Sequence, residues 1–162
     1  MIRERRPEDL DRLCAVLQAI EPESPLLSGL DLKGWLEEHD AERSWVFDMA
    51  PVSVAPTKNV VGHVQIIRPA KDSPVARSLA NTHATPDNSL AIVKLFVKPN
   101  GYEYGIGRYL LKESIKYIQG QGKIPVLDVH GNAFLSKEFY AKYGFEEVPS
   151  ADPAVAPMIF AR

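Results

Sequence analysis

The sequence contains very little cysteine and no long apolar run. Cys14 is the only cysteine among the 162 residues, so the chain cannot form an internal disulfide. It falls on an apolar stripe, where a free cysteine usually behaves as a small core residue, and a reducing compartment fits best. Residues 1–6 do not form a basic-then-apolar leader, and no apolar run approaches the roughly 20 residues needed to span a bilayer. We therefore expect a cytoplasmic protein with no membrane partner.

An excess of positive charge is also absent. The 19 Lys and Arg residues and 21 Asp and Glu residues give a formal net charge of -2. Proteins that bind nucleic acid need clustered Lys and Arg to neutralise phosphates, so the charge balance argues against a nucleic-acid partner. The four histidines are scattered and do not combine with Cys14 at the spacing of a metal site, so we expect no metal.

The composition is typical of one folded domain over residues 1–162. A chain of this length buries roughly two-thirds of its unfolded surface, which is enough for a core that carries a site. Its 45% apolar and 25% charged residues are ordinary values for a globular protein. The sequence contains no internal repeat.

Hydrophobic periodicity predicts strands and helices in the first half of the chain. A short strand over residues 1–4 precedes a helix that begins near Pro7, with apolar residues at three- and four-residue steps up to Ile20. A second short helix is predicted over residues 32–39. Strands over 44–49 and 59–68 follow, and a turn between them predicts a hairpin.

The second half begins with a long polar stretch, residues 69–88, in which we predict a short helix near 75–80. The nearly continuous apolar run over 90–97 is typical of a central strand buried on both faces. The pattern then predicts a helix over 105–119, a strand over 124–129, a helix over 133–142 and closing strands over 144–148 and 155–161.

A glycine-containing turn joins the apolar strand to the helix after it. The turn reads Gly101-Tyr-Glu-Tyr-Gly-Ile-Gly107. A helix N-terminus offers unpaired N–H groups and the positive end of the helix dipole, and glycine lets a phosphate approach them closely. An isolated Gly-x-Gly would more often only shape a turn. Leu110 occupies the third glycine position of a dinucleotide fingerprint and no Gly-Lys-Ser/Thr follows, so neither NAD nor ATP is indicated.

A second block, about two dozen residues after that helix begins, runs from Asn132 through Tyr140 to Gly144-Phe145. Together the two blocks resemble the acyl-CoA-binding core of the GNAT family of N-acetyltransferases. The positions that match the family patterns are Leu95, Val97, Pro99, Gly105 and Gly107 in the first block, and Ser136, Tyr140, Gly144 and Phe145 in the second. Three positions depart from them: Tyr102 replaces Gln or Arg, Glu103 replaces Gly, and Asn132 lies one residue early.

The resemblance implies an α/β fold, a single-domain GNAT-like mixed and mostly antiparallel twisted sheet flanked by helices, with splayed central strands. It also implies acetyl-CoA as cofactor and CoA as product, with the pantetheine arm pairing with the strand edge at residues 95–97. The residues that this likeness places at the cofactor are Leu95, Phe96, Val97, Tyr102, Glu103, Tyr104, Gly105, Ile106, Gly107, Arg108, Asn132, Ser136, Phe139 and Tyr140.

The same likeness gives two residues a catalytic role. The backbone N–H of Val97 is a candidate donor to the thioester oxygen as negative charge develops there. Tyr140 occupies the position of the general acid that protonates the leaving thiolate, although a tyrosine on an amphipathic helix is otherwise often a packing aromatic. Asn132 either contacts the pantetheine or caps the helix after it, and we favour the cap.

The sequence assigns no general base. Many relatives carry Glu at the position of Ala91, so His63, His83, His130 and ordered water remain candidates. An alkyl amine with a pKa near ~10 needs such a base or a desolvating pocket at neutral pH.

The function favoured by the sequence is acetyl transfer from acetyl-CoA to a primary amine of a small molecule. Direct attack in a ternary complex is expected, because Cys14 on its apolar stripe is a poor nucleophile. Two alternatives stay open: a non-catalytic acyl-CoA-binding or sensing module, and an acetyltransferase of protein N-termini or lysines. A homodimer is compatible with the resemblance. We expect acceptor contacts from residues 24–39, from 69–88 and from the C-terminal hairpin.

Overall fold

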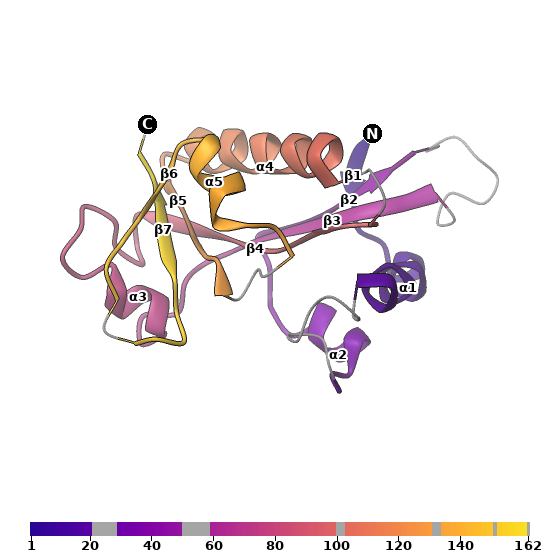
Figure 1. Cartoon of the computed structure of the whole chain (residues 1–162), viewed down its shortest axis with the longest axis horizontal. Helices are drawn as coiled ribbons and strands as arrows, with labels where there is room; N and C mark the ends of the chain where they lie inside the picture. The colour runs from indigo at the N-terminus through magenta and orange to yellow at the C-terminus, as the bar shows by residue number, and fades with distance from the viewer. Residues whose placement is uncertain (21–28, 50–58, 100–102, 131–133, 151, 162) are drawn as a thin grey trace.

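One seven-stranded mixed sheet with helices on both faces forms the protein, as predicted (Figure 1). A computed structural model describes residues 1–20, 29–49, 59–99, 103–130, 134–150 and 152–161, with only the backbone of residues 103 and 104. The strand order is β1-β2-β3-β4-β5-β7-β6, and the pairing of β4 with β5 is parallel whereas the others are antiparallel.

The first half follows the predicted order. Its elements are β1 (Ile2–Glu4), the 3-10 turn η1 (Pro7–Asp9), α1 (Leu10–Ile20), α2 (Leu32–Leu36), β2 (Arg43–Asp48) and β3 (Val60–Ile67). The hairpin is confirmed, since β2 and β3 pair antiparallel with Trp45 opposite Val64. Helix α2 is three residues shorter than predicted: Asp31 caps its start through the N–H of Gly34, and Glu37 ends it.

The second half contains α3 (Pro74–Ser78), β4 (Ser89–Val97), α4 (Glu103–Gly120), β5 (Ile124–Asp128), α5 (Lys137–Lys142), β6 (Phe145–Glu147) and β7 (Pro157–Phe160). Helix α4 begins two residues before the predicted start. Helix α5 begins four residues later than predicted, and its N-cap is Ser136, whose side chain accepts a hydrogen bond from the N–H of Phe139. The prediction that Asn132 caps this helix is therefore wrong; Asn132 itself lies outside the described residues.

The two faces of the sheet carry different helices. Helix α4 covers one face, and α1 and α2 lie on the other (Figure 1). Gly62 in β3 lets α4 approach closely, because a Cβ there would lie 3.0 Å from Leu110 and 3.2 Å from Ile106. The side chain of Cys14 is half-buried and packs against the core that α1 and α2 form with the sheet, as its position on an apolar stripe predicts.

The central strands separate after a short parallel pairing. Strand β4 has nine residues, but its described pairing with β5 covers Ser89, Leu90 and Ala91 alone. Beyond that point β5 continues its ladder with β7, where Leu127 lies opposite Met158. The described pairing of β4 with β5 therefore stops before the second half of β4, as expected for the splayed central strands of the resemblance. No helix in the described part of the chain is both long and apolar enough to cross a membrane.

The turn after α5 requires glycine. Gly144 has a φ of 105°, and a Cβ there would lie 2.9 Å from Cε1 of the Phe160 ring in β7. Both the left-handed backbone and the close approach disfavour a side chain at this position. The Gly-Phe pair in the sequence thus turns the chain sharply from α5 into β6.

We expect Gly144→Ala to lower the free energy of unfolding by about 2 kcal/mol, because it adds a steric clash to the strain of a positive φ. Gly122→Ala is the matched control: its φ is 70°, but a Cβ there meets nothing within 4 Å. The control should lose about 1 kcal/mol from backbone strain alone. Urea denaturation of both variants measures the difference, and equal losses would show that the contact with Phe160 is unimportant.

Candidate active site

An extra residue interrupts β4 three residues beyond Ala91, its last described partner of β5. Gln65 of β3 lies opposite Val93, but His63 lies opposite Phe96, so two steps along β3 face three steps along β4. The bulged residue is Lys94, whose φ of 53° is unusual for a residue with a side chain. This bulge reverses the alternation of β4, because Ile92 before it and Leu95 after it pack into the same core beneath α4.

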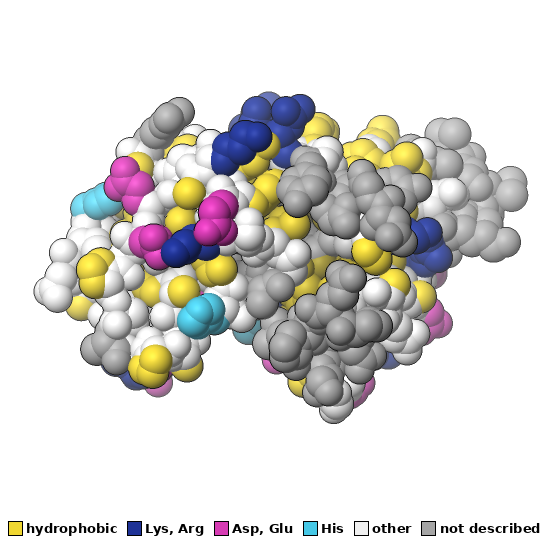
Figure 2. All heavy atoms as spheres, in the orientation of Figure 1, with side chains coloured by type: hydrophobic (Ala, Val, Ile, Leu, Met, Phe, Trp, Pro, Cys, Tyr) yellow, Lys and Arg dark blue, Asp and Glu magenta, His cyan; other side chains and the backbone are white. Residues whose placement is uncertain are grey.

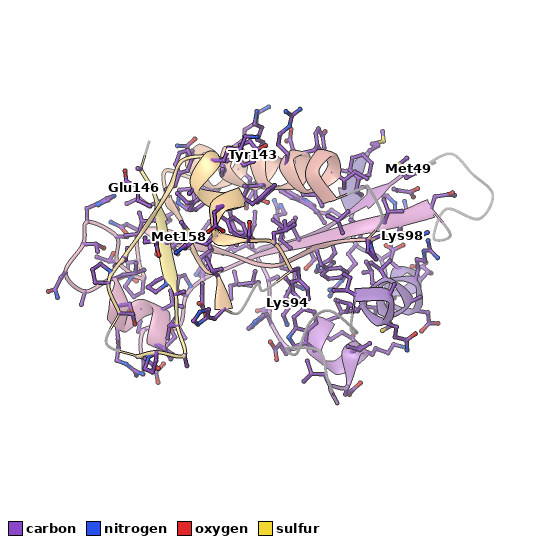
Figure 3. The ribbon with its side chains drawn as sticks, in the orientation of Figure 1. Met49, Lys94, Lys98, Tyr143, Glu146 and Met158 are labelled. Atoms are coloured by element: carbon purple, nitrogen blue, oxygen red, sulfur yellow. The ribbon has the colours of Figure 1, made fainter. Side chains whose placement is uncertain are left out.

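Polar groups hold the bulged residue at both of its ends. Nδ1 of His63 lies 2.9 Å from the carbonyl oxygen of Lys94. At the other end, the Lys94 ammonium donates to the carbonyl of Trp35 and to Oε1 of Glu38 at 2.8 Å, and lies 4.5 Å from the centroid of the Trp35 ring. Burial lowers the pKa of Lys94, whereas the contact with Glu38 raises it in part. In Figure 3, Lys94 lies between the sheet and α2, and it thus joins the bulge to the end of that helix.

His63 is a neutral structural group in this arrangement. Its side chain is fully buried and stacks on Phe96, with ring centroids 5.0 Å apart. Burial, aided by the nearby charge of Arg5, lowers the pKa of His63 to about 3, against the opposing hydrogen bond to Lys94. Since Arg5 donates to Nε2 at 3.1 Å, the ring proton sits on Nδ1 and points to the carbonyl of Lys94. Both ring nitrogens are engaged, which removes His63 from the candidate general bases.

The edge of β4 beyond the bulge points its backbone toward the splay. Lys98 donates its N–H to Val61 of β3 at 2.7 Å. Neighbouring N–H groups in a strand point to opposite edges, so the N–H of Val97 faces the side of β5. The side chains of Leu95 and Phe96 lie in the two cores on opposite faces of the sheet, so a ligand at this edge would contact their backbone.

Helix α4 directs its N-terminus to the loop that follows β4. The first N–H groups of a helix have no partner within it, and among the described residues here they belong to Glu103, Tyr104 and Gly105. Gly105 is exposed, and a Cβ there would meet nothing within 4 Å. The side chains of Glu103 and Tyr104, and all of Tyr102, lie outside the described structure.

Gly107 has a different environment from Gly105. It is buried, and a Cβ there would lie 3.4 Å from Leu135 and 3.7 Å from Phe139 and Val97. Its small size therefore serves the packing of α4 against β4 and α5. Arg108 follows on the exposed face, and Figure 2 shows Lys and Arg side chains gathered over α4. Positive charge beside a helix N-terminus suits a phosphate-bearing ligand.

Tyr140 brings a buried hydroxyl to the same region. It comes from α5, is 1% exposed, and shares the core beneath α4 with Leu95 and Val97. Phe139 and Phe145 contact its ring edge-on, with centroids 5.4 and 6.2 Å away. Its Oη has no hydrogen-bond partner in the described part of the chain. Burial raises the pKa of Tyr140, so the phenol carries its proton at neutral pH.

A pocket of about 410 Å³ opens on the other side of the bulge. We call it the bulge pocket; its walls include Trp35, Glu38, His39, Val93, Lys94 and Asp128. Trp35, Glu38 and His39 fall within residues 24–39, and Ser73 and Val75 within residues 69–88, two segments expected to contact the acceptor. Val93, Lys94 and Asp128 were not among the predicted site residues. Lys94 was nevertheless a visible signal, because it is the single charged residue in the otherwise apolar run over 90–97.

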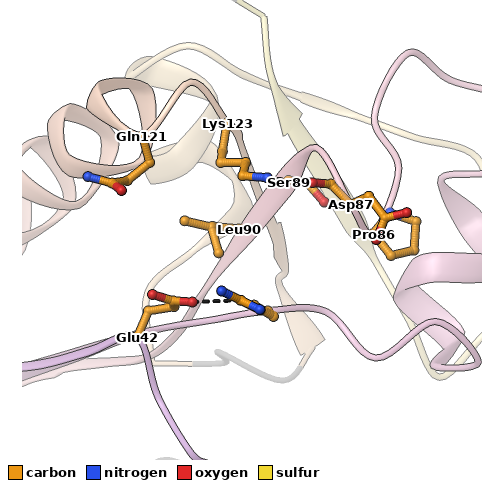
Figure 4. A pocket seen from close by; sticks show the side chains of 8 residues that line it. Glu42, Pro86, Asp87, Ser89, Leu90, Gln121 and Lys123 are labelled. Carbon is orange, nitrogen blue, oxygen red and sulfur yellow. Dashed lines mark hydrogen bonds and ion pairs between the residues drawn. The ribbon is translucent and has the colours of Figure 1, made fainter.

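A second, polar pocket of about 280 Å³ lies near the start of β4 and the end of α4 (Figure 4). Glu42 accepts a hydrogen bond from Arg68 at 2.6 Å in its wall, and Lys123 donates to the carbonyl of Asp87. It lies at the opposite end of α4 from Gly105, and its lining contains neither Val97 nor Tyr140.

Comparisons with known proteins are consistent with this geometry. The fold is similar to that of aminoglycoside 6'-acetyltransferase type Ii (TM-score 0.65, 18% identity, 98% of this chain and 95% of the other). It is also similar to a PaiA N-acetyltransferase from Thermoplasma acidophilum in complex with coenzyme A (TM-score 0.65, 18% identity, 100% of this chain and 98% of the other). A third similar structure is a GNAT family acetyltransferase from Brucella melitensis in complex with acetyl-CoA (TM-score 0.59, 19% identity, 100% of this chain and 88% of the other). At these identities the likeness shows the fold alone.

The family of the protein is identified from its sequence. No curated protein sequence matches the chain. The model of the acetyltransferase (GNAT) family, whose members use acetyl-CoA, matches residues 10–145, which include the bulged strand, the α4 turn and Tyr140. The chain therefore belongs to the GNAT acetyltransferase family.

Proposed function

We propose that this protein is an N-acetyltransferase that transfers the acetyl group of acetyl-CoA directly to a primary amine of a small molecule. The observation that carries the proposal is the buried hydroxyl of Tyr140, which has no partner among the described residues. Leaving such a group unsatisfied costs roughly 1–3 kcal/mol, so a ligand that supplies a partner at this point would be favoured.

The residues present fit the parts of a bound acetyl-CoA. Backbone N–H groups of residues 103–105 would hold the pyrophosphate at the α4 N-terminus, where Gly105 leaves open space. The edge of β4 at residues 95–97 would pair with the pantetheine amides, with the N–H of Val97 directed to the thioester oxygen. Phe139, Ser136 and Arg108 remain predicted contacts.

Acetyl-CoA supplies an activated acetyl group on a thiol that leaves as a thiolate. Tyr140 would donate its phenolic proton to that sulfur, a role that suits a phenol kept protonated by burial. The N–H of Val97 would stabilise negative charge on the carbonyl oxygen during attack. Both groups come from rigid elements of the core, so their positions are fixed before the reaction.

Direct transfer is supported by the state of Cys14. Burial raises the pKa of this thiol, with nearby Asp11 acting in the same direction. A thiol rather than a thiolate is therefore present at neutral pH, and a thiol is a weak nucleophile. Cys14 also packs in the core of α1 and α2, on the face of the sheet opposite Tyr140.

A thiol-release assay with acetyl-CoA and a panel of small amines, polyamines and peptides tests the proposal. Turnover with a small amine and none with peptides is the expected result. Turnover with peptides alone would favour a protein acetyltransferase. Tight binding of CoA without turnover on any acceptor would favour the sensing module.

For Tyr140→Phe we expect kcat to fall about a hundredfold while acetyl-CoA binding persists, because the ring stays and the proton donor is lost. Tyr143→Phe is the matched control: this tyrosine ends the same helix, and its ring contacts Phe139. Its kcat should match the wild type. An unchanged kcat in Tyr140→Phe, with chemistry rate-limiting, would return Tyr140 to a packing role.

Gly105→Ala should weaken CoA binding by about tenfold, or ~1.4 kcal/mol, because a helical Cβ leans toward the helix N-terminus and would occupy the space of the phosphates. Gly120→Ala at the opposite end of α4 is the control, since a Cβ there also meets nothing within 4 Å. Calorimetry should find the control unchanged in affinity and both variants at least as stable as the wild type, since alanine favours helix. Equal affinities for both variants would contradict the phosphate site.

Cys14→Ala should remain active, and initial-rate plots with both substrates varied should intersect. Parallel lines, as in ping-pong kinetics, would indicate an acetylated enzyme. Mass spectrometry of the wild type after brief exposure to acetyl-CoA gives an independent check: an acetyl group recovered on Cys14 that passes to an amine at the rate of turnover would overturn direct transfer.

A further inference from the structure

We propose that the bulge pocket receives the acceptor amine and that His39 is the general base that takes its proton. This inference rests on the proposed function and adds the residue that the sequence did not assign. It is based on where the pocket opens, on what holds the His39 ring, and on the positions of the other histidines.

The pocket opens beside the reacting end of the proposed donor site. Val93 and Lys94 form both the bulge of β4 and part of the pocket wall. The strand edge that would hold the thioester begins at the next residue, Leu95. An amine in this pocket therefore approaches the bulge from the side of α2, whereas Tyr140 and α4 lie on the other face of the sheet.

The lining of the pocket suits a primary amine on an apolar arm. Ile67, Val75 and Val93 provide aliphatic surface, and Trp35 adds an aromatic ring. Asp128 at the end of β5 contributes a carboxylate, with its Oδ1 oriented by the N–H groups of His130 and Ala156. A carboxylate attracts an ammonium group, so the amine would arrive in its charged form.

The charges around the His39 ring come from every element that lines the pocket. Nε2 of His39 lies 3.3 Å from Oε1 of Glu38, which also accepts from Lys94 of β4. Arg68, after β3, is paired with Glu42, and Asp128 lies at the end of β5. The proximity of Glu38 favours the tautomer with its proton on Nε2, which leaves the lone pair of Nδ1 to accept a proton.

The electrostatic environment keeps His39 ready to act as a base. Burial lowers the pKa of His39 below its usual 6.5, and the charge of Lys94 lowers it further, whereas Glu38 raises it. The ring is therefore neutral at pH 7 and becomes inactive only when the pH falls below its pKa. A base with a pKa somewhat below the working pH is suited to accept a proton from an ammonium group as that proton is lost in the reaction.

The other three histidines are excluded by position. The structure describes all four. Both nitrogens of His63 are engaged in the core. His83 is exposed and lies in a separate pocket beside β6 and β7, with Glu146 and Glu147. His130 is exposed and does not line the bulge pocket.

The reaction balances with two groups of this chain. The ammonium passes one proton to Nδ1 of His39, and the nitrogen lone pair then forms the bond to the thioester carbon. The nitrogen carries a positive charge once that bond has formed, and it releases its second proton to solvent. The carbon–sulfur bond breaks, its electron pair leaves on sulfur, and Tyr140 supplies the proton that sulfur takes. Solvent returns the His39 proton to Tyr140 between turnovers.

The pH profile of kcat/KM with the best small amine of the panel tests the role of His39. In the wild type, kcat/KM should rise about tenfold per pH unit at acidic pH and level off above the His39 pKa, because the amine arrives as ammonium. In His39→Ala only the uncharged amine can react, so kcat/KM should rise about tenfold per unit from pH 6 to 9, with a loss of about a hundredfold at pH 7. Added imidazole should restore activity to His39→Ala, since the ring is partly exposed and its removal opens the pocket.

His83→Ala is the control and should keep the wild-type profile. A His39→Ala enzyme with an unchanged plateau and no response to imidazole would overturn the assignment, while leaving the acetyltransferase function intact. A wild type that acetylates no amine would instead contradict the proposed function.

A binding measurement tests the pocket without activity. Phenethylamine, added to the protein at pH 7, should shift the imidazole NMR signals of His39 and leave those of His83 in place. His39 should titrate below pH 6.5 in the free protein. Unshifted His39 signals at millimolar phenethylamine, or a His39 pKa above 7, would overturn the proposal.

Discussion

The bulge at Lys94 is the constraint on which the rest of the site depends. One additional residue in β4 reverses which side chains face α4, so Ile92 and Leu95 both enter the same core although they are three positions apart. It lies three residues beyond Ala91, where the described ladder of β4 with β5 ends. The bulge thus sets which way residues 95–97, the part of β4 that the proposed cofactor site uses, face on the sheet.

Maintaining this bulge requires an unusual set of buried groups. A lysine with positive φ is strained by about 1–2 kcal/mol, and burying its ammonium adds a desolvation penalty. The structure compensates with the His63 ring on the carbonyl of Lys94, and with Trp35 and Glu38 at the ammonium. Arg5 fixes the tautomer of His63 and also donates to the carbonyl of Leu36 at the end of α2. The donor side of the sheet and the wall of the bulge pocket are thus held by one hydrogen-bonded network.

The sequence predicted the elements better than the details that make the site. The sequence predicted every strand and helix of the described residues, most of them from apolar periodicity, because burial on a sheet or a helix face leaves a regular pattern. The ends of helices were predicted less accurately. The N-cap of α5 is Ser136 rather than Asn132, because Ser136 lies directly before the turn that packs Phe139 and Tyr140. The α4 glycines look alike in sequence, yet Gly107 faces the core and Gly105 faces open space. The bulge pocket was predicted only in part. The segments 24–39 and 69–88 supply His39 and Val75 to its lining, whereas Lys94 and Asp128 come from strands whose meeting the sequence does not show.

Tyr140 indicates how function and stability are balanced in this fold. Its ring makes the packing contacts of a buried phenylalanine, with Phe139 and Phe145 around it. The hydroxyl makes no hydrogen bond among the described residues, so within them it is a buried polar group without compensation. A molecule that brings an acceptor into this core would supply the hydrogen bond that the described residues do not. The same argument applies to the bulge, because a strained lysine contributes little to a sheet that would pair more fully without it. The Tyr140 hydroxyl and the Lys94 bulge both lower the stability of the free chain. They lie on opposite sides of the position where the thioester and the amine would meet.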